Sequence, residues 1–258
     1  MTETITNAPA GTAITGLDLI GCTVSDLQKS LTFYRDTLGL QQSFGNEGGA
    51  EFEFPNGETL GIWKPEGGEY PVGFGVMFTV ADVKAAVELC NSRGAKISDV
   101  FESPVCKMAM GQDPDGNGFI IHQRTQKIDP VPPPHVKSQT SINGIDWAGY
   151  FVGDVKRSLA FYRDVLGLPA TSIYESGQGV EFTLGDGTTF GVWRPDGVQE
   201  GGKAKGGAMM FAATDAHAKV AQLRERGVQI TDVEDTDNCY MAFTRDPDDI
   251  AVIIHQIK

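Results

Sequence analysis

The sequence predicts an α+β fold in which one module occurs twice in tandem. Three observations support this prediction: a long internal repeat, strand and helix patterns that alternate within each copy, and a proline-rich segment between the copies. Self-similarity at a fixed offset indicates repeated structural units. We therefore expect a disordered tail at residues 1–13, a first module at 14–126, a linker at 127–141 and a second module at 142–258.

The repeat is clearest in one segment with helical spacing. Ser30–Leu40 and Ser158–Leu168 agree at 9 of 11 positions, at an offset of 128 residues. The offset grows to 130 where Leu60–Pro65 matches Phe190–Pro195, and to 133 near the end of each module. Both insertions can be placed in glycine-rich loops, where changes of length are tolerated.

Residue patterns in the first module predict its elements in order. A strand at Leu17–Val24 leads into a helix at Asp26–Leu38, with Ser25-Asp26 as its N-cap and Gly39 just past its end. A hairpin turn is expected at Asn56-Gly57. The other predicted elements are strands at Glu51–Phe54, Leu60–Trp63 and Phe74–Val80, a helix at Ala81–Arg93, and strands at Cys106–Gly111 and Phe119–His122. Prolines at 130 and 132–134 predict an extended, semi-rigid linker.

Composition excludes several classes of function. The chain has 258 residues, 40% of them hydrophobic, which is typical of a globular protein. Its net charge of −13 opposes binding to a nucleic-acid backbone. No apolar stretch is long enough for a membrane span, and the N-terminal tail lacks the features of a secretory signal. The 4 cysteines form no CxxC pair, so we expect a cytoplasmic protein without a disulfide framework.

Two motifs connect the sequence to a known family. FYRDxLGL follows the first predicted strand of each module, and DPDGN precedes the last strand of the first module, where the second module has DPDDI. In this order and spacing, the chain resembles the vicinal oxygen chelate superfamily, the group of glyoxalase I, bleomycin-resistance proteins and extradiol dioxygenases. The resemblance covers nearly all of both modules. It implies paired βαβββ modules whose curved mixed sheets enclose a cavity for a small molecule.

The resemblance also implies a divalent metal, but this sequence departs from the pattern. The family places a His or Gln on the first strand and a Glu on the last strand of each module. The four positions hold Leu19, Trp147, Ile120 and Ile253, none of which can ligate a metal. A shift by one residue offers Asp18 and Asp146, which strand alternation would turn to the opposite, helix-side face. We therefore expect neither a metal nor another cofactor, with a relocated divalent metal as the alternative.

A cysteine and a histidine recur in both modules on either side of the DPD turn. Because residues of constant index sum oppose each other in an antiparallel hairpin, Cys106 is expected near His122, and Cys239 near His255. The histidines fall two residues beyond the lost glutamate positions, so they should point into the cavity. Three interpretations stay open: structural packing, histidines that contact the ligand or act as acid and base, and a relocated zinc site built from these four residues.

Apolar and aromatic residues are expected to line the cavity. Phe151 shares the facing of Trp147, and Thr23 shares that of Leu19. The full predicted ligand-contacting set is Trp147, Phe151, Leu19, Thr23, Trp63, Trp193, Ile120 and Ile253. Such a lining suits a flat apolar or aromatic ligand, although the rings would also simply fill the space left by the metal. The acidic residues bordering it, Glu51, Glu53 and Glu181, are interpreted as edge charges.

Together these patterns predict a protein of the glyoxalase and bleomycin-resistance type that binds a small, partly aromatic molecule between its modules without the usual metal. The alternative is a lyase, isomerase or dioxygenase-type enzyme that uses His122 and His255, with or without a relocated divalent metal. The expected partner is a small-molecule ligand or substrate, with no nucleic acid and no membrane. We expect a monomer or a homodimer.

Overall fold

The structure is a computed structural model. It describes residues 13–64, 73–104, 106–112, 114, 116–125, 142–204, 206–245, 247 and 249–258, and for Asp18 the backbone alone. The predicted linker at 127–141 and the predicted tail up to residue 12 lie outside the described residues. The same holds for Asp113 and Asp115 of the predicted DPD turn. No helix in the described ranges is long and apolar enough to cross a membrane.

Each repeat contains two consecutive βαβββ units. The elements of the first repeat are β1 (Gly16–Thr23), α1 (Leu27–Leu31), the π-helix η1 (Thr32–Thr37), β2 (Gln42–Asn46), β3 (Gly49–Glu53), β4 (Thr59–Trp63), β5 (Gly73–Thr79), α2 (Val83–Ser92), β6 (Phe101–Glu102), β7 (Cys106–Gln112) and β8 (Gly118–Arg124). Those of the second repeat are β9 (Ile142–Phe151), α3 (Val155–Ala160), the π-helix η2 (Phe161–Val165), β10 (Ala170–Ile173), β11 (Gly179–Thr183), β12 (Thr189–Trp193), β13 (Gly207–Ala213), α4 (Ala216–Glu225), β14 (Glu234–Asp235), β15 (Cys239–Arg245) and β16 (Ala251–Ile257).

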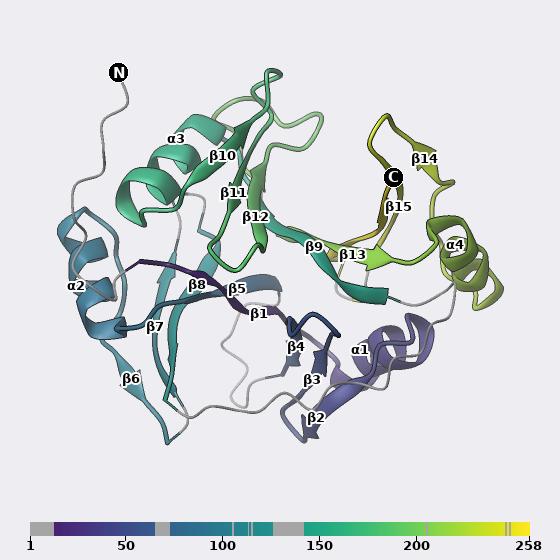
Figure 1. Cartoon of the computed structure of the whole chain (residues 1–258), viewed down its shortest axis with the longest axis horizontal. Coiled ribbons are helices and arrows are strands. Elements are labelled where there is room, and N and C mark those ends of the chain that lie inside the picture. Colours follow the sequence, from purple (N-terminus) through teal and green to yellow (C-terminus); the bar gives the residue numbers. More distant parts are fainter. Residues whose placement is uncertain are drawn as a thin grey trace. The chain divides into compact units, whose positions relative to one another are not determined.

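The strands of each repeat join into one mixed sheet (Figure 1). The order is β2-β3-β4-β1-β5-β8-β7-β6 in the first repeat, and the second repeats it as β10-β11-β12-β9-β13-β16-β15-β14. β1 pairs in parallel with β4, and β5 with β8, because a helix and further strands separate the partners in the chain. The predicted α+β class, with two tandem modules and curved mixed sheets, is confirmed. The enclosed cavity remains a prediction.

An aspartate begins every α-helix among the described residues. The four N-caps are Asp26, Asp82, Asp154 and Asp215. The carboxylate of Asp26 accepts hydrogen bonds from the amides of Gln28 and Lys29, at 3.1 and 3.2 Å. These amides have no partner inside the helix, so the side chain satisfies them. The N-cap predicted at Ser25-Asp26 is confirmed.

The FYRD motif forms a π-helix, which the sequence did not predict. The expected helix at Asp26–Leu38 begins as α1 but widens into η1, where the amide of Leu38 donates to the carbonyl of Phe33 at 2.8 Å, five residues back. The wider turn carries Tyr34, which is fully buried. Gly39 ends the segment in the left-handed region, with φ 76°, as predicted. η2 repeats this arrangement in the second repeat.

Edge strands are the elements that the patterns missed. β2 and its counterpart β10 lie at one end of their sheets, and the two-residue strands β6 and β14 lie at the other. β2 has the sequence QSFGN and is largely exposed. An edge strand with no buried face carries no alternation of apolar and polar residues, so sequence patterning does not reveal it.

The chain forms two compact units, and each unit combines parts of both repeats. One contains residues 1–18, 76–128 and 152–205, and the other contains residues 19–75, 129–151 and 206–258. The compact units therefore cut across the two copies of the sequence. The domain boundaries at 14–126 and 142–258 remain a prediction about the repeat.

Aromatic side chains from both repeats form the core of the first compact unit. Phe78 of β5 lies edge-on to Phe190 of β12, with ring centroids 5.1 Å apart, and Phe190 also contacts Tyr162 of η2 at 4.8 Å. Phe119 of β8 contacts Phe161 at 5.9 Å. In the same unit, α2 packs against β7 and β8 (Figure 1). Stacked and edge-on ring pairs add to the stabilisation that burial itself provides.

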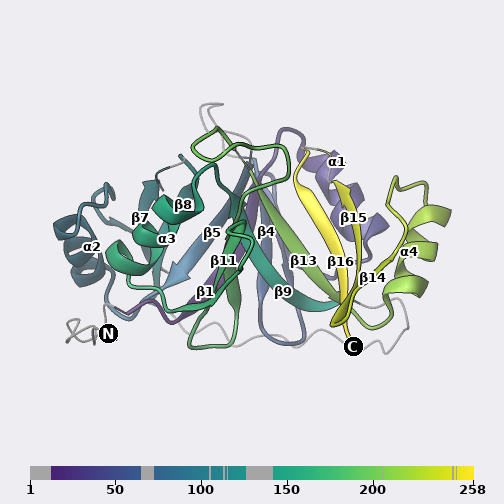
Figure 2. The same cartoon turned by 90° about the horizontal axis from the view of Figure 1, so that it is seen from above.

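The second compact unit is built in the same way. Phe54, which follows β3, contacts Phe211 of β13 at 6.0 Å, and Phe74 of β5 lies edge-on to Tyr150 of β9 at 5.5 Å. The α4 helix packs against β15 and β16 (Figures 1 and 2). Glu58 accepts a hydrogen bond from the amide of Ile145 at 2.6 Å, which ties the start of β4 to β9.

A buried lysine of α4 reaches the end of η1 in this unit. Lys219 is only 2% exposed, and its ammonium donates to the carbonyl of Leu38 at 2.5 Å. Arg226 donates to the carbonyl of Thr37, also at 2.5 Å. Burial lowers the pKa of Lys219 to about 8, and the neighbouring charge of Arg226 acts in the same direction. Helix C-terminal carbonyls attract cations, so the contact offsets part of the cost of burying the ammonium group.

Candidate functional site

Four adjacent strands of the second unit carry a continuous apolar row. Met210 of β13 pairs with Trp147 of β9 on one side and with Ile253 of β16 on the other, and Ile253 pairs with Phe243 of β15. Paired residues point to the same side of a sheet, so these four side chains form a row across β9, β13, β16 and β15. We call Trp147, Met210, Ile253 and Phe243 the apolar row.

The face that carries the apolar row is turned away from α4. The first amide of α4, at Ala216, donates to Oε1 of Gln256 at 2.8 Å. Gln256 therefore faces α4, and by alternation Ile253 and His255 face the other way. Gln123 of β8 accepts from the amide of Val83 in α2 at 3.1 Å, so the same facing holds in the first repeat.

Further apolar side chains surround the apolar row. Trp147, Ala208 and Ile253 form a buried cluster, and the partly buried side chains packed against it are Phe151, Met210, Met241, Phe243 and Ala251. Trp147 is 8% exposed and Ile253 6% exposed. Trp147 and Phe151, which the sequence predicted to share a facing, do belong to one cluster. The sequence reasoning did not anticipate Met210, Met241 and Phe243, because the pairing partners of β9 were not known.

A histidine and an aspartate lie beside this apolar surface. Nδ1 of His255 is 2.5 Å from a carboxylate oxygen of Asp146. In the ladder, His255 is flanked by Ala212 of β13 and Met241 of β15. Its side chain is 11% exposed, and that of Asp146 is 28% exposed.

The orientation of Asp146 corrects an expectation from strand alternation. Met210 pairs with Trp147, but the next residue, Phe211, pairs with Ile145, so Asp146 is an extra residue in β9. A bulge of this kind interrupts alternation and re-aims a side chain. Asp146 therefore points to the face of His255. The prediction that it points to the helix side is wrong. The signal in the sequence was an acidic residue within a largely apolar strand. Its counterpart Asp18 has a side chain outside the described residues.

The predicted pairing of cysteine with histidine is displaced by two residues. Met108 opposes His122, whereas Cys106 opposes Arg124. In the second repeat, Met241 opposes His255, and Cys239 opposes Ile257. The ladder of β7 and β8 ends at the pair formed by residues 112 and 118, so the intervening loop is longer than the tight DPD turn assumed from the sequence. The cysteines lie diagonally from the histidines and not opposite them.

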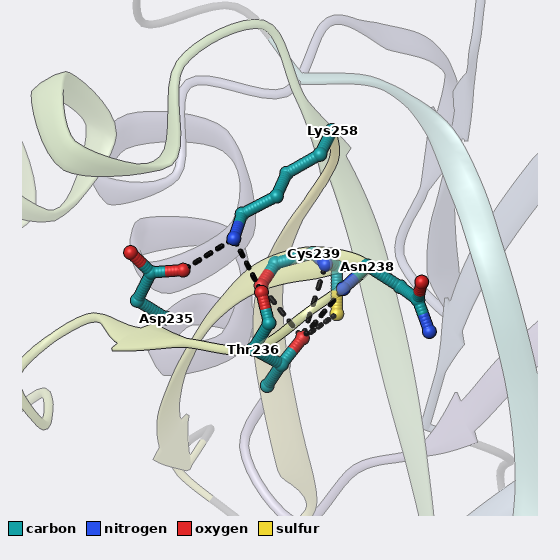
Figure 3. A network of polar contacts seen from close by, with 5 residues as sticks. All are labelled: Asp235, Thr236, Asn238, Cys239 and Lys258. Atoms are coloured by element: carbon teal, nitrogen blue, oxygen red, sulfur yellow. Dashed lines mark hydrogen bonds and ion pairs between the residues drawn. The ribbon is translucent and has the colours of Figure 1, made fainter.

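Each of these cysteines takes part in a local turn. Sγ of Cys239 lies 3.2 Å from Oγ1 of Thr236, and Sγ of Cys106 lies 3.3 Å from Oγ of Ser103. Figure 3 shows that Lys258 closes the turn of Cys239 by binding Asp235 and the carbonyl of Thr236. These contacts fit the structural interpretation of the cysteines.

In the first repeat, Ile120 and His122 lie on the face of β8 that points away from α2. In β8, Ile120 pairs with Met77 and His122 with Thr79, both of β5, and His122 is 7% exposed. Leu19 is buried in β1.

The tryptophans at the ends of β4 and β12 are packed against glycines. The ring of Trp63 covers Gly49, and that of Trp193 covers Gly179, so closely that a Cβ there would lie 2.3 Å from either ring. Thr23 of β1 pairs with Trp63. Tyr174 contacts Trp193 at 5.2 Å and donates a hydrogen bond to Glu181 at 2.9 Å. These contacts support a packing role for both tryptophans.

The residues present do not fit the family's metal site. Trp147 and Ile253, which the resemblance places at two of its positions, flank Met210 and offer no atom that can ligate a metal. Among the described side chains, no three His, Cys, Asp or Glu residues come together in a way that could hold a metal ion. The relocated zinc site, which would need His122, His255, Cys106 and Cys239, stays a prediction, because the first histidine and cysteine belong to one compact unit and the second pair to the other.

Comparison with known proteins agrees with this architecture. The family model described as Glyoxalase/Bleomycin resistance protein/Dioxygenase superfamily matches residues 16–121 and 144–254. The Mn(II)-bound glyoxalase from Novosphingobium aromaticivorans superposes with a TM-score of 0.70 at 13% identity, over 95% of this chain and 82% of the other. An extradiol ring-cleaving dioxygenase from B. fuscum gives 0.70 at 18% identity, over 96% and 73%. The homoprotocatechuate 2,3-dioxygenase from Arthrobacter globiformis gives 0.69 at 17% identity, over 96% and 82%.

At these identities, the likeness to the solved structures concerns the fold alone. Among curated proteins, none matches the sequence. The family model, in contrast, covers most of both repeats. The chain therefore belongs to the Glyoxalase/Bleomycin resistance protein/Dioxygenase superfamily.

Proposed function

We propose that the protein binds a small molecule with a flat apolar or aromatic part on the apolar row, without the metal usual in the family. The observation that carries this proposal is the row itself, in which Trp147 and Ile253 stand where metal-ligating side chains are expected. An apolar surface with a few polar groups beside it is typical of small-molecule sites. A cytoplasmic location and a monomeric or dimeric state remain predictions.

The proposal is tested with methoxynaphthalene as an apolar probe and methyl-labelled methionine NMR. Met210 lies in the apolar row and Met241 next to it, so their methyl signals should shift when the probe binds. Met209 lies on the opposite face of β13 and is fully buried, so its signal should stay in place. Shifts confined to methionines outside this face would contradict the proposal.

Replacing Trp147 by leucine should weaken binding of the probe about fivefold, because a ring contact contributes roughly 1 kcal/mol beyond burial. Leucine keeps the position apolar, and Phe101→Leu on an exposed edge strand is the matched control. Affinity measured by calorimetry should be the same with and without EDTA. Binding that is lost on chelation and restored by Mn²⁺ would refute the metal-free part of the proposal.

A second candidate is an enzyme of the lyase, isomerase or dioxygenase type in which His255, and by sequence His122, transfers protons. The contact of Asp146 with Nδ1 of His255 favours it, because a carboxylate that orients an imidazole is a common feature of acid–base sites.

Exchange of the methyl protons of acetylnaphthalene in deuterated water offers a simple assay of proton transfer. Nε2 would remove a methyl proton, and a deuteron would return to the same carbon. Wild type should exchange faster than His255→Gln, and equal rates would exclude His255 as the base.

A further inference from the structure

We propose that Asp146 and His255 form the polar anchor of the apolar row, and that the ligand carries a hydroxyl group on an aromatic or enolic carbon. The proposal rests on the proposed function, since it names the ligand class of that site. Asp146 is the positioning residue, and His255 is the group that contacts the ligand.

The contact with Asp146 decides which nitrogen of the ring carries hydrogen. An ionised carboxylate only accepts hydrogen bonds, so Nδ1 of His255 must be the donor across the 2.5 Å contact. In a neutral imidazole the other nitrogen, Nε2, is then unprotonated and acts as an acceptor. With the ring in this neutral form, the site presents an acceptor to its ligand.

Nε2 is free to meet a ligand. Within the part of the chain that the structure describes, Asp146 is the partner recorded for His255. No buried side-chain nitrogen or oxygen in this part lacks a hydrogen-bond partner, so Nε2, which has none recorded, is not sealed inside the protein. The ring stays largely covered, at 11% exposure, which fixes its orientation.

The surroundings of His255 favour a ligand group that donates a hydrogen bond to Nε2. In the ladder it stands between Ala212 and Met241, one row away from Ile253 and Met210, so its neighbours across the strands are apolar. A ligand that covers Nε2 without donating to it leaves a desolvated acceptor unpaired, which costs roughly 1–3 kcal/mol. A donor attached to a flat ring satisfies Nε2 while the ring lies on the apolar row.

The negative charge near the site further restricts the class of ligand. Asp146 places a carboxylate beside the site, and the whole chain carries a net charge of −13. A carboxylate or phosphate ligand would be repelled and would present acceptors to an acceptor. A neutral phenol or enol is not repelled by the carboxylate, and it offers a hydrogen-bond donor to the acceptor. Its proton lies on the hydroxyl oxygen and points to Nε2.

Three probes that share the same naphthalene ring test this inference. Naphthol donates a hydrogen bond, whereas methoxynaphthalene and acetylnaphthalene only accept. Wild type should bind naphthol about tenfold more tightly than methoxynaphthalene, the ratio that one hydrogen bond of typical strength gives. In His255→Ala the preference for naphthol over methoxynaphthalene should fall to about one.

Asp146→Asn provides a variant in which the preference should reverse. The amide of asparagine can donate to Nδ1, which leaves the hydrogen of the neutral ring on Nε2. The site then presents a donor, so acetylnaphthalene should gain affinity and naphthol should lose it. If naphthol and acetylnaphthalene lost affinity for this variant to the same extent, Asp146 would have only a structural role, and the proposed anchor would be wrong.

Nitrogen NMR of labelled imidazole in the wild-type protein keeps the test independent of whether the variants fold. Naphthol should shift the Nε2 signal of His255, and methoxynaphthalene should not. Equal affinities for these two probes in wild type would overturn the anchor and leave the proposed apolar site intact. No binding of any probe to the apolar row would overturn both.

Discussion

Replacing Phe190 by alanine is expected to lower the free energy of unfolding by about 3–5 kcal/mol. The side chain is fully buried, and its ring contacts Phe78 at 5.1 Å and Tyr162 at 4.8 Å. Alanine would leave a cavity in the core of the first compact unit and remove two ring contacts together. Because Phe78 belongs to the first repeat and Phe190 to the second, the loss would report on a core shared by both copies.

Phe101→Ala is the matched control for this experiment. Phe101 is 61% exposed on the edge strand β6, so its loss should change stability by less than about 0.5 kcal/mol. Chemical denaturation followed by circular dichroism measures both variants. Similar losses at the two positions would show that Phe190 does not lie in a packed core.

Lys219 is expected to make stability depend on alkaline pH. Its pKa in the folded protein is about 8, against 10.5 in the unfolded chain. Below pH 8 the group is charged in both states, and the folded state carries the burial cost. Between about 8 and 10.5 the unfolded state binds more protons, so stability gains with rising pH, on the order of 3 kcal/mol across the window.

The measurement compares wild type with Lys219→Met, which keeps the length of the side chain and cannot titrate. Subtracting the two removes the contributions of all other groups, so the stability of wild type relative to the variant should rise from pH 8 to 10. Lys29→Met, at a lysine whose side chain is 74% exposed, should show no such trend. A flat or falling difference would mean that the contacts with Leu38 and Gln222 fully compensate the burial of the ammonium.

Sequence patterns predicted part of the apolar surface of the candidate site. Strand alternation placed Trp147 and Phe151 on one face, and both lie in the apolar cluster. The absence of donor atoms at Leu19, Trp147, Ile120 and Ile253 was readable directly. Met210 and Phe243 escaped notice because their role depends on which strands are neighbours, and strand order is set by packing across the whole sheet.

The role of Asp146 was misjudged for a local reason. Strand alternation assumes one residue per step, and the bulge in β9 adds a residue there. A bulge leaves no fixed signature in composition, so the sequence pointed the carboxylate away from His255. The predicted pairing of Cys106 with His122 was wrong for a related reason, because the length of the loop between β7 and β8 shifts the register of the two strands.

The sequence by itself determined the duplication, the α+β class and the aspartate cap of the first helix. These follow from residue identity and from spacing along the chain, which are local properties. The tertiary structure alone decided three further features: the interleaving of both repeats in each compact unit, the π-helical FYRD segment, and the meeting of Asp146 with His255, 109 residues apart. These depend on long-range packing, where burial of large side chains and the hydrogen-bond register of paired strands outweigh local preference.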